Sequence, residues 1–427
     1  MNIGFDAKRA AQNRTGLGNY SRFVIRILSE KFAGNQYHLY TPKPHRMPYL
    51  QEIPTLKHLF LHFPPQGIWS RIRSLWRVWG ITKDIQKDGI QIFHGLSNEL
   101  PLNIGTPEQR KMKAGGKGCK YIVTIHDLIF IHTPQYYHWI DRQIYNFKFR
   151  RACRCADRVI AVSEYTKQEI MHYYHTPESK IDVVYQGCDP VFSQEIEEGK
   201  LQEVKARYQF PDKFVLYVGS IEERKNLMLV AKAMAELNRR NRSQGNQGSL
   251  ESQGNQGSLE SQGNQGSQGN QNQAQNQDAA AIHVVAVGRR TVYVDQIQDF
   301  LKAQGIDHLF HFYHQVPYAD LPSFYKWAST FAYPSRIEGF GIPLLEAISS
   351  GVPAIGCTGS CLEEAGGPNS IYVNPDDAKG MADAILRTCT DEPLRQHMIS
   401  EGKKYALNFS DEKLSHDLMK VYESLSE

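Results

Sequence analysis

Two carboxylates stand eight residues apart in a glycine-rich stretch of the second half of the chain. Glu338 precedes the run Gly339–Gly341, and Glu346 follows Pro343, a residue suited to the first turn of a helix. Loop-exposed carboxylates among glycines are poor core residues, and two of them can each accept hydrogen bonds from a vicinal diol. Backbone amides at such a helix start favour a phosphate or a sugar hydroxyl.

Two adjacent cations provide a second chemical feature. Arg224 and Lys225 follow the apolar strand predicted at Phe214–Gly219, after a short loop that begins at Ser220. In open α/β sheets the carboxyl ends of the strands face the ligand. A guanidinium fork beside an ammonium suits a diphosphate, so we favour this interpretation over an ordinary solvated loop.

A weaker feature lies near the start of the chain. Gly16 and Gly18 come between the first predicted strand and a helix, where glycines let backbone amides approach an anion. The third glycine of a dinucleotide fingerprint is replaced by Ser21, which disfavours a nicotinamide site. The glycine pair alone does not decide between an anion site and a tight turn.

Apolar segments of strand length alternate with amphipathic helical segments throughout the chain. This alternation is typical of α/β proteins with parallel sheets. It occurs in two successive series, which predicts two doubly wound, Rossmann-like domains. The predicted strands are Met1–Asp6, Tyr37–Tyr40, Leu56–Leu61, Ile90–His94, Lys120–Ile125, Arg158–Val162 and Ile181–Tyr185, and then Phe214–Gly219, Ile282–Val287, Leu309–Phe312, Thr330–Tyr333, Pro353–Ile355 and Ser370–Val373.

The two series set the expected domain boundaries. Residues 1–186 form the first domain, 187–212 a linker and 213–409 the second domain. Residues 410–427 form a final helix, capped by Ser410, that we expect to pack back on the first domain.

One insert interrupts the second series. Residues 243–277 hold 11 Gln, 7 Gly, 6 Asn and 6 Ser, and repeat the nonapeptide Ser-Gln-Gly-Asn-Gln-Gly-Ser-Leu-Glu. Each copy has one apolar residue to bury, so a β-helix is rejected and a disordered loop is predicted. The insert follows the helix Leu227–Arg239 and precedes a strand, which places it away from the strands' carboxyl ends.

The segment from Ile68 to Trp79 allows two interpretations. Its apolar residues share one helical face, and cations lie among and after them (Arg71, Arg73, Arg77 and Lys83). A helix that packs in the core is favoured about two to one over a membrane-surface helix, because buried amphipathic helices are commoner.

Composition excludes several classes of protein. The net charge of +4 over 427 residues does not suggest a nucleic-acid binder. No run of 18 apolar residues predicts a transmembrane helix, and the start lacks the pattern of a signal peptide. Seven cysteines without a Cys-x-x-Cys pair are expected to be reduced thiols of a cytoplasmic protein, and no metal site is predicted.

At this point the residues resemble a family. The stretch from Glu338 to Glu346 is similar to the Glu-x7-Glu motif of family 4 (group 1) retaining glycosyltransferases, whose two domains form the GT-B fold around a central cleft. The His126-Asp127 pair at a strand end resembles the same family, and the loop from His94 to Glu99 resembles its polysaccharide and mannosyltransferase-like members. The resemblance covers nearly the whole chain outside 239–281.

The resemblance implies a role for each matching residue. Glu346 would bind the ribose, and Glu338 would lie by the donor sugar. His126 would contact that sugar near the reacting carbon, and Arg224 and Lys225 would neutralise the diphosphate. Further donor contacts would come from Gly16, Gly18, Ser220, Gly339, Phe340, Gly341 and Ile342, and acceptor-side contacts from His94, Asn98 and Asp127.

The resemblance also implies the reaction. The expected activity is metal-independent transfer of a hexosyl group, mannosyl or glucosyl, with retention of configuration and without a cofactor. GDP-mannose or a UDP-hexose would be the donor, and a glycan or lipid-linked saccharide the acceptor, with a peripheral contact to the inner face of a membrane left open. The alternatives are a GT-B-like binding subunit without catalysis and a GT-B sugar-nucleotide epimerase.

Overall fold

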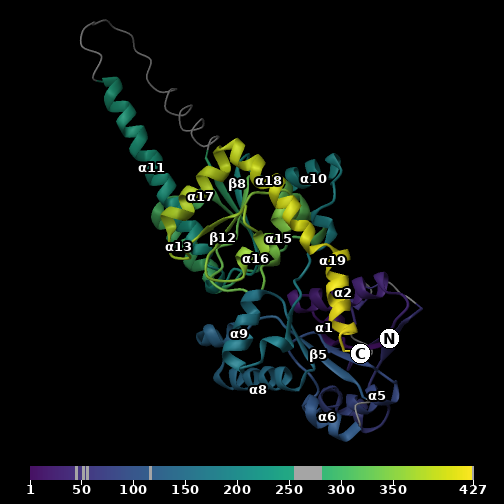
Figure 1. Cartoon of the computed structure of the whole chain (residues 1–427). Helices are drawn as coiled ribbons and strands as arrows, with labels where there is room; N and C mark the ends of the chain where they lie inside the picture. The colour runs from purple at the N-terminus through teal and green to yellow at the C-terminus, as the bar shows by residue number, and fades with distance from the viewer. Residues whose placement is uncertain (44–46, 51–52, 54–56, 115–117, 254–280, 426–427) are drawn as a thin grey trace, which may run out of the picture. The chain divides into compact units, whose positions relative to one another are not determined.

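The computed structural model describes residues 1–427 apart from 44–46, 51–52, 54–56, 115–117, 254–280 and 426–427. The described chain divides into two compact units. The first comprises Met1–Gly187 together with Asn408–Glu427, and the second comprises Cys188–Leu407. Each unit is built on one parallel sheet with helices (Figure 1).

The sheet of the first unit has seven parallel strands in the order β3-β2-β1-β4-β5-β6-β7. The strand order reverses between β1 and β4. These two strands are neighbours in the sheet, and Ile3 of β1 pairs with Ile92 of β4. The carboxyl ends at such a reversal form the ligand site of doubly wound sheets. The strands are β1 (Asn2–Asp6), β2 (Gln36–Tyr40), β3 (Leu59–His62), β4 (Ile92–Gly95), β5 (Lys120–Ile125), β6 (Arg158–Ala161) and β7 (Ile181–Val183).

The sheet of the second unit has six parallel strands in the order β10-β9-β8-β11-β12-β13. Here the reversal lies between β8 and β11, where Thr330 pairs with Val215. The strands are β8 (Phe214–Val218), β9 (His283–Val287), β10 (Phe310–Tyr313), β11 (Thr330–Ala332), β12 (Ala354–Cys357) and β13 (Ile371–Val373). The predicted alternation and its two doubly wound sheets are confirmed. The predicted strand from Leu56 begins outside the described residues.

Apart from α19, the helices named below for the first unit connect successive strands. Ser163 caps α9 by accepting a hydrogen bond from the amide of Thr166, and Ser410 caps α19 through the amide of Lys413, as their positions predict. The principal helices are α1 (Lys8–Gln12), α2 (Gly16–Lys31), α3 (Ile68–Arg71), α4 (Arg73–Leu75), the π-helix η2 (Trp76–Gly80), α5 (Ile81–Lys87), α6 (Pro107–Ala114), α7 (Ile129–His132), α8 (Trp139–Cys155), α9 (Glu164–Tyr174) and α19 (Asp411–Glu423).

The last helix belongs to the first unit although it follows the second in sequence. Arg26 of α2 pairs with Asp411 at 2.8 Å, and Lys31 pairs with Glu412 at 2.6 Å. The α19 face that is buried carries Leu414, Leu418, Met419, Val421 and Tyr422. This apolar stripe holds α19 against α2.

The helices of the second unit include one in the stretch 187–212, which was expected to be a linker. There α10 packs on α14, since Trp327 donates to the carbonyl of Leu201 at 3.2 Å and Arg207 pairs with Asp320 at 2.7 Å. The principal helices are α10 (Glu198–Tyr208), the 3-10 helix η6 (Glu223–Lys225), α11 (Leu227–Gln253), α13 (Val292–Gln304), α14 (Leu321–Trp327), α15 (Ile342–Ser349), α16 (Leu362–Gly366), α17 (Ala378–Thr390) and α18 (Glu392–Ala406).

The structure corrects the expectation for the start of the insert. Helix α11 continues to Gln253, so residues 243–253 are helical rather than disordered. Once a helix is nucleated each further residue adds a backbone hydrogen bond, and polar residues such as Gln and Glu carry good helix propensity. The remaining residues of the insert, 254–277, lie outside the described part of the chain.

The favoured interpretation of the segment 68–79 is also wrong for most of its apolar residues. Only Trp76 is buried, whereas Ile68, Ile72, Leu75 and Trp79 are exposed. The segment breaks into α3, α4 and η2 instead of forming one helix. The breaks rotate successive side chains off a single stripe, so they do not face the core together.

Candidate active site

The two cations of the second unit lie at the carboxyl end of β8. They occupy the 3-10 helix η6, which Asn226 ends in the left-handed conformation at φ 58°. The Asn226 side chain donates to the carbonyl of Pro375 at 2.8 Å, which ties this loop to the segment after β13. The amide of Arg336 also donates to the carbonyl of Arg224 at 3.0 Å. The loop is therefore held from two sides.

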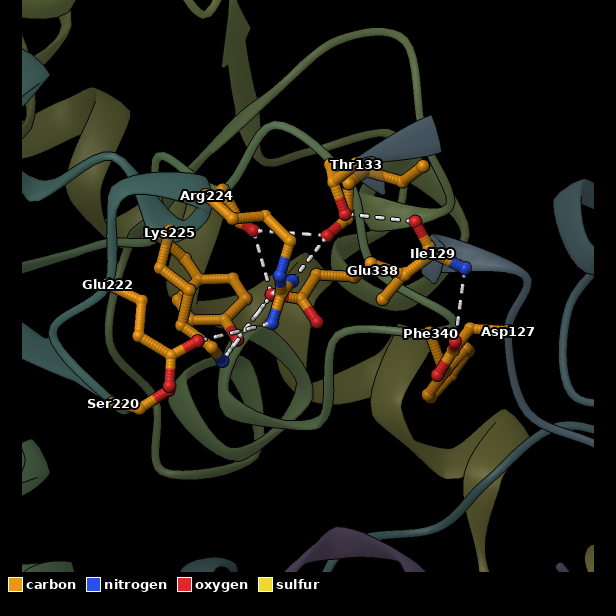
Figure 2. A network of polar contacts seen from close by, with 12 residues as sticks. Asp127, Ile129, Thr133, Ser220, Glu222, Arg224, Lys225, Glu338 and Phe340 are labelled. Carbon is orange, nitrogen blue, oxygen red and sulfur yellow. Dashed lines mark hydrogen bonds and ion pairs between the residues drawn. The ribbon is translucent and has the colours of Figure 1, made fainter. Parts of the chain in front are cut away.

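Glu338 joins both cations (Figure 2). Its Oε1 lies 3.0 Å from Nη1 of Arg224 and 3.4 Å from Nζ of Lys225. The same carboxylate accepts hydrogen bonds from Ser335 at 2.7 Å and from Tyr333 at 3.1 Å. Arg224, Lys225 and Glu338, predicted as separate features of the sequence, form one cluster.

The two cations keep Glu338 ionised. Burial alone would raise the pKa of Glu338, but Lys225 and Arg224 overcome that effect and lower it to about 2. The carboxylate is therefore ionised at neutral pH and faces both cations, while the more exposed Glu222 lies 4.0 Å from Arg224. Two adjacent cationic donors held in fixed positions suit an anionic ligand such as a diphosphate.

The loop from Glu338 into α15 has a fixed backbone. Gly341 adopts φ 111°, and a Cβ there would come 2.7 Å from Leu362, so only glycine fits. The thiol of Cys361 lies 3.0 Å from the carbonyl oxygen of Glu338 and 3.1 Å from that of Phe340. Gly339 lies in the same loop, and α15 begins at Ile342, directly after Gly341.

Glu346 lies in the second turn of α15 and is half-buried. The hydroxyl of Tyr325 donates to its Oε2 at 2.8 Å. Burial and the neighbouring Asp189 raise the pKa of Glu346 to about 7, against the opposing effects of Tyr325 and Lys225. Lys225 lowers the pKa of both Glu338 and Glu346, so the two glutamates are coupled electrostatically through one cation.

Gly16 and Gly18 of the first unit form the first turn of α2. Gly18 donates its amide to the carbonyl of Thr15 at 2.8 Å. A Cβ on Gly18 would come 1.8 Å from the carbonyl oxygen of Asn13, whereas Gly16 has open space. Glycine is therefore required at 18 by close backbone approach, whereas no neighbouring atom requires glycine at 16.

His126 is buried directly after β5. Its Nε2 donates to the carbonyl of Leu96 at 2.9 Å, and its Nδ1 lies 3.3 Å from the amide nitrogen of Gln186. Burial lowers the pKa of His126 to about 4, so the ring is neutral. Asn98 accepts the amide hydrogen of His126 at 2.8 Å, while the next residue, Asp127, accepts that of Ile129 at 3.1 Å.

His94 is placed differently from these neighbours. Its ring is fully buried, with Nδ1 at 2.5 Å from the hydroxyl of Tyr422 and Nε2 at 2.8 Å from that of Thr124. Tyr20 bonds the same Thr124 hydroxyl at 3.1 Å and packs edge-on against His126. Both ring nitrogens of His94 are already hydrogen-bonded and the ring is buried. His94 would therefore affect an acceptor sugar only indirectly, by positioning the residues around it.

Several supporting residues were not predicted. Tyr333 and Ser335 flank Glu338 closely in sequence, so their proximity to the motif was a usable signal. In the second unit, Tyr325 reaches Glu346 and Cys361 reaches Glu338 from other elements. In the first unit, Gln186 reaches His126. Nothing in the sequence neighbourhood of these three residues marks them. Their roles depend on strand order and helix packing.

Comparison with known proteins defines the class of the chain. Its two doubly wound sheets superpose on GT-B glycosyltransferases. A glycosyltransferase from Rickettsia africae ESF-5 matches with a TM-score of 0.69 at 14% identity, covering 100% of this chain and 98% of that one. Anabaena Alr3699/HepE, solved in complex with UDP and glucose, matches with a TM-score of 0.65 at 14% identity over 99% and 100% of the two chains. The protein has the GT-B fold.

Sequence comparison names the family. Residues 15–192 match the model of Glycosyltransferase Family 4, and residues 271–405 match that of Glycosyl transferases group 1. The chain belongs to the family 4, group 1 glycosyltransferases. The O-antigen chain mannosyltransferase B of Escherichia coli is 26% identical over 442 residues, which span 100% of both proteins. The family and fold expected from the Glu-x7-Glu stretch are confirmed.

Among the described residues, no helix has both the length and the apolar character needed to cross a bilayer. Within the same residues, no group of three or more His, Cys, Asp or Glu side chains is arranged to hold a metal ion.

Proposed function

We propose that this glycosyltransferase moves a hexosyl group from a nucleoside diphosphate sugar to a glycan or lipid-linked saccharide. The first choice for that group is mannosyl, and the second is glucosyl. The product would belong to a surface polysaccharide or glycoconjugate. The similarity to an O-antigen mannosyltransferase along the whole chain supports the mannosyl group and the glycan acceptor. The solved UDP complex of a GT-B neighbour supports a nucleotide-sugar donor, GDP-mannose or a UDP-hexose.

The observation that carries the proposal is the cluster of Arg224, Lys225 and Glu338. One carboxylate within 3.4 Å of both cations holds two adjacent cationic donors at the carboxyl end of β8. A departing nucleoside diphosphate gains negative charge in the transition state, and preorganised donors stabilise that charge. We propose that these side chains act where other glycosyltransferases use a metal ion, without a cofactor.

The remaining roles follow from chemistry at each position. Glu346 accepts hydrogen bonds from the ribose hydroxyls. The donor sugar and phosphates are held by Glu338, Ser220 and the segment Gly339–Ile342. In the first unit we assign Gly16 and Gly18 to the diphosphate and His126 to the sugar. His94, Asn98 and Asp127 are assigned to the acceptor side.

The proposed reaction retains the anomeric configuration. Glu338 is the one carboxylate assigned to the donor sugar, and its ion pairs with Arg224 and Lys225 make it a poor nucleophile. The acceptor hydroxyl would therefore attack from the face that the diphosphate leaves, and the leaving phosphate oxygen would take the hydroxyl proton. We further propose a cytoplasmic protein that contacts the inner face of a membrane peripherally, because a lipid-linked acceptor lies there.

The test is a screen of GDP-mannose, UDP-glucose, UDP-GlcNAc and UDP-galactose, first by thermal shift and then by turnover with a panel of saccharide acceptors. A donor at about 100 times its Kd adds roughly 2.7 kcal/mol of stability. NMR of the product determines its anomeric configuration, and EDTA tests metal independence. Binding without turnover would indicate a non-catalytic subunit, and a changed sugar on the nucleotide would indicate an epimerase.

A further inference from the structure

Helix α1 begins just after β1, at the carboxyl end of the first unit's sheet, and its first two residues are cations. Lys8 and Arg9 are both half-buried. Among the residues that the structure describes, neither side chain forms an ion pair or a hydrogen bond. A charge that is partly withdrawn from water without a partner is costly, so these two cations point to a ligand of opposite charge.

The carboxylates beside α1 are already paired with other cations. Nη2 of Arg77 lies 2.6 Å from Asp6, and its Nη1 lies 2.8 Å from Glu99. Lys148 of α8 also lies 3.2 Å from Glu99. Burial would raise the pKa of Glu99, but Arg77 and Lys148 overcome that effect and lower it to about 2. Each carboxylate therefore has a cation from η2 or α8 as its partner.

The paired groups leave little space between them. Together with Phe93 and the segment 100–102 they line a cavity of about 10 Å³, which has room for about one water molecule. Neither a sugar ring nor a phosphate fits into a cavity of that size. Asp6, Arg77 and Glu99 therefore hold this end of the sheet in place, and a ligand would meet the half-buried cations of α1 instead.

Electrostatic effects show which groups lie around Lys8 and Arg9. Burial, Arg77 and Arg9 lower the pKa of Lys8, against the opposing effects of the two carboxylates. An anion beside Lys8 would relieve this repulsion between like charges. Burial chiefly lowers the pKa of His126, and the charge of Arg9 adds to that effect. Arg9 therefore lies within electrostatic reach of the ring that we assign to the donor sugar.

We propose that Lys8 and Arg9 bind a phosphate group of the acceptor. The inference rests on the proposed function, because it names the class of acceptor that the first unit takes. A guanidinium fork beside an ammonium matches the several oxygens of a phosphate better than a neutral sugar hydroxyl. The cations assigned to the donor diphosphate, Arg224 and Lys225, belong to the second unit, whereas these two belong to the first.

The first test compares three forms of each saccharide in the acceptor panel: the methyl glycoside, the glycosyl 1-phosphate and the decyl glycosyl diphosphate. We expect the KM of the phosphate-bearing forms to be lower than that of the methyl glycoside by about tenfold or more. Lys8→Ala and Arg9→Ala should each reduce this ratio of KM values about tenfold. Lys87→Ala removes an exposed cation at the end of α5, and this matched control should keep the parent's ratio.

The two phosphate-bearing forms also identify the source of the phosphate. A lower KM for the decyl diphosphate indicates a lipid-linked acceptor, and a lower KM for the 1-phosphate indicates a free sugar phosphate. Either result supports the proposal. Equal KM values for the methyl glycoside and its phosphate would overturn it. Variants at Lys8 and Arg9 that raised the KM of the donor as much as that of the acceptor would overturn it as well, because the cations would then serve the donor.

Calorimetry tests the site without turnover. Mannose 1-phosphate is titrated into the full chain with Arg224→Ala and Lys225→Ala, which removes the phosphate ligands proposed in the second unit. We expect binding to persist in this variant and to weaken about tenfold or more when Lys8→Ala and Arg9→Ala are added. Circular dichroism checks that each variant is folded.

The calorimetric outcomes separate this site from the proposed function. Absence of phosphate binding in the first variant, or binding that the changes at Lys8 and Arg9 leave unaltered, would overturn the site alone. Absence of turnover with every donor would instead count against the proposed function.

Discussion

Oε1 of Glu338 lies 3.0 Å from Nη1 of Arg224, and the same oxygen is 3.4 Å from Nζ of Lys225. One carboxylate thus holds two cations of the preceding βα loop in place. Each side chain of this cluster is less than one-sixth exposed, so the pairing is only weakly screened by solvent.

Glu338→Gln should show whether Glu338 positions Arg224 and Lys225 or binds the nucleotide itself. The variant keeps the shape of the side chain but removes the anion that Arg224 and Lys225 share. We expect turnover to fall about 10²-fold, whereas affinity for a free nucleoside diphosphate should hold or rise because the positive charge increases. Calorimetry with the diphosphate and initial rates measure the two effects. Loss of diphosphate binding in a folded variant would show that Glu338 itself contacts the nucleotide.

Arg224→Ala and Lys225→Ala should each lower turnover about 10²–10³-fold, because each removes a donor to the leaving diphosphate. Arg239→Ala is the control, since that guanidinium is exposed on α11 and pairs only locally with Glu236. Rates are compared with and without EDTA. A double variant that regains its rate with Mg²⁺ would mean that a metal handles the leaving charge.

Glu346 predicts a pH dependence of nucleoside binding. Ribose hydroxyls donate hydrogen bonds to the ionised carboxylate. The affinity for a nucleoside should therefore rise as the pH is raised through the Glu346 pKa of about 7. Glu346→Gln should abolish this dependence, and Glu346→Ala should cost about 1.5–3 kcal/mol of binding. Calorimetry from pH 6 to 8 with a nucleoside, which lacks titrating phosphates, gives the result. A pH-independent affinity in the parent protein would contradict the assignment.

The same carboxyl affects stability in the opposite direction. Its folded pKa lies above its unfolded value of about 4.3, so the folded state binds more protons between these values. Its contribution to the free energy of unfolding is present below pH about 4.3 and is lost as pH rises through 7. Urea unfolding of the parent and of Glu346→Gln at pH 5 and 8 measures this difference. An equal difference at both pH values would place the carboxyl's pKa outside that interval.

Deleting Ser243–Gln277 should leave folding intact and turnover within about twofold. The buried residues of α11, among them Val230, Ala233 and Leu237, precede the deletion. Helix α11 runs back from the carboxyl end of β8, and β9 begins at the amino ends of the strands, so both ends of the deletion lie away from the ligand side. Circular dichroism and initial rates compare the two chains. A folded variant that lost tenfold or more in rate would show that the insert reaches a substrate.

The local pattern of the chain was sufficient for the fold class and the family. Strand and helix periods repeat along each half, and each is a short-range property that residues from Phe214 to Val218 or from Gly16 to Lys31 express by themselves. The motif from Glu338 to Glu346 is contiguous for the same reason: one βα connection carries it. Ser163 and Ser410 were found as caps because capping depends on only three or four residues.

Tertiary structure decided which of these residues meet. Arg224 and Glu338 are over a hundred positions apart, and only the pairing of β8 with β11 brings their loops together. The sequence also does not predict Tyr325 beside Glu346, because the packing of α14 on α15 brings the two side chains together. Tertiary structure also reversed the expectation for Ile68 and Trp79, because burial is set by what lies opposite a side chain. A sequence pattern shows that a face is apolar, whereas the fold determines whether that face meets the core or the solvent.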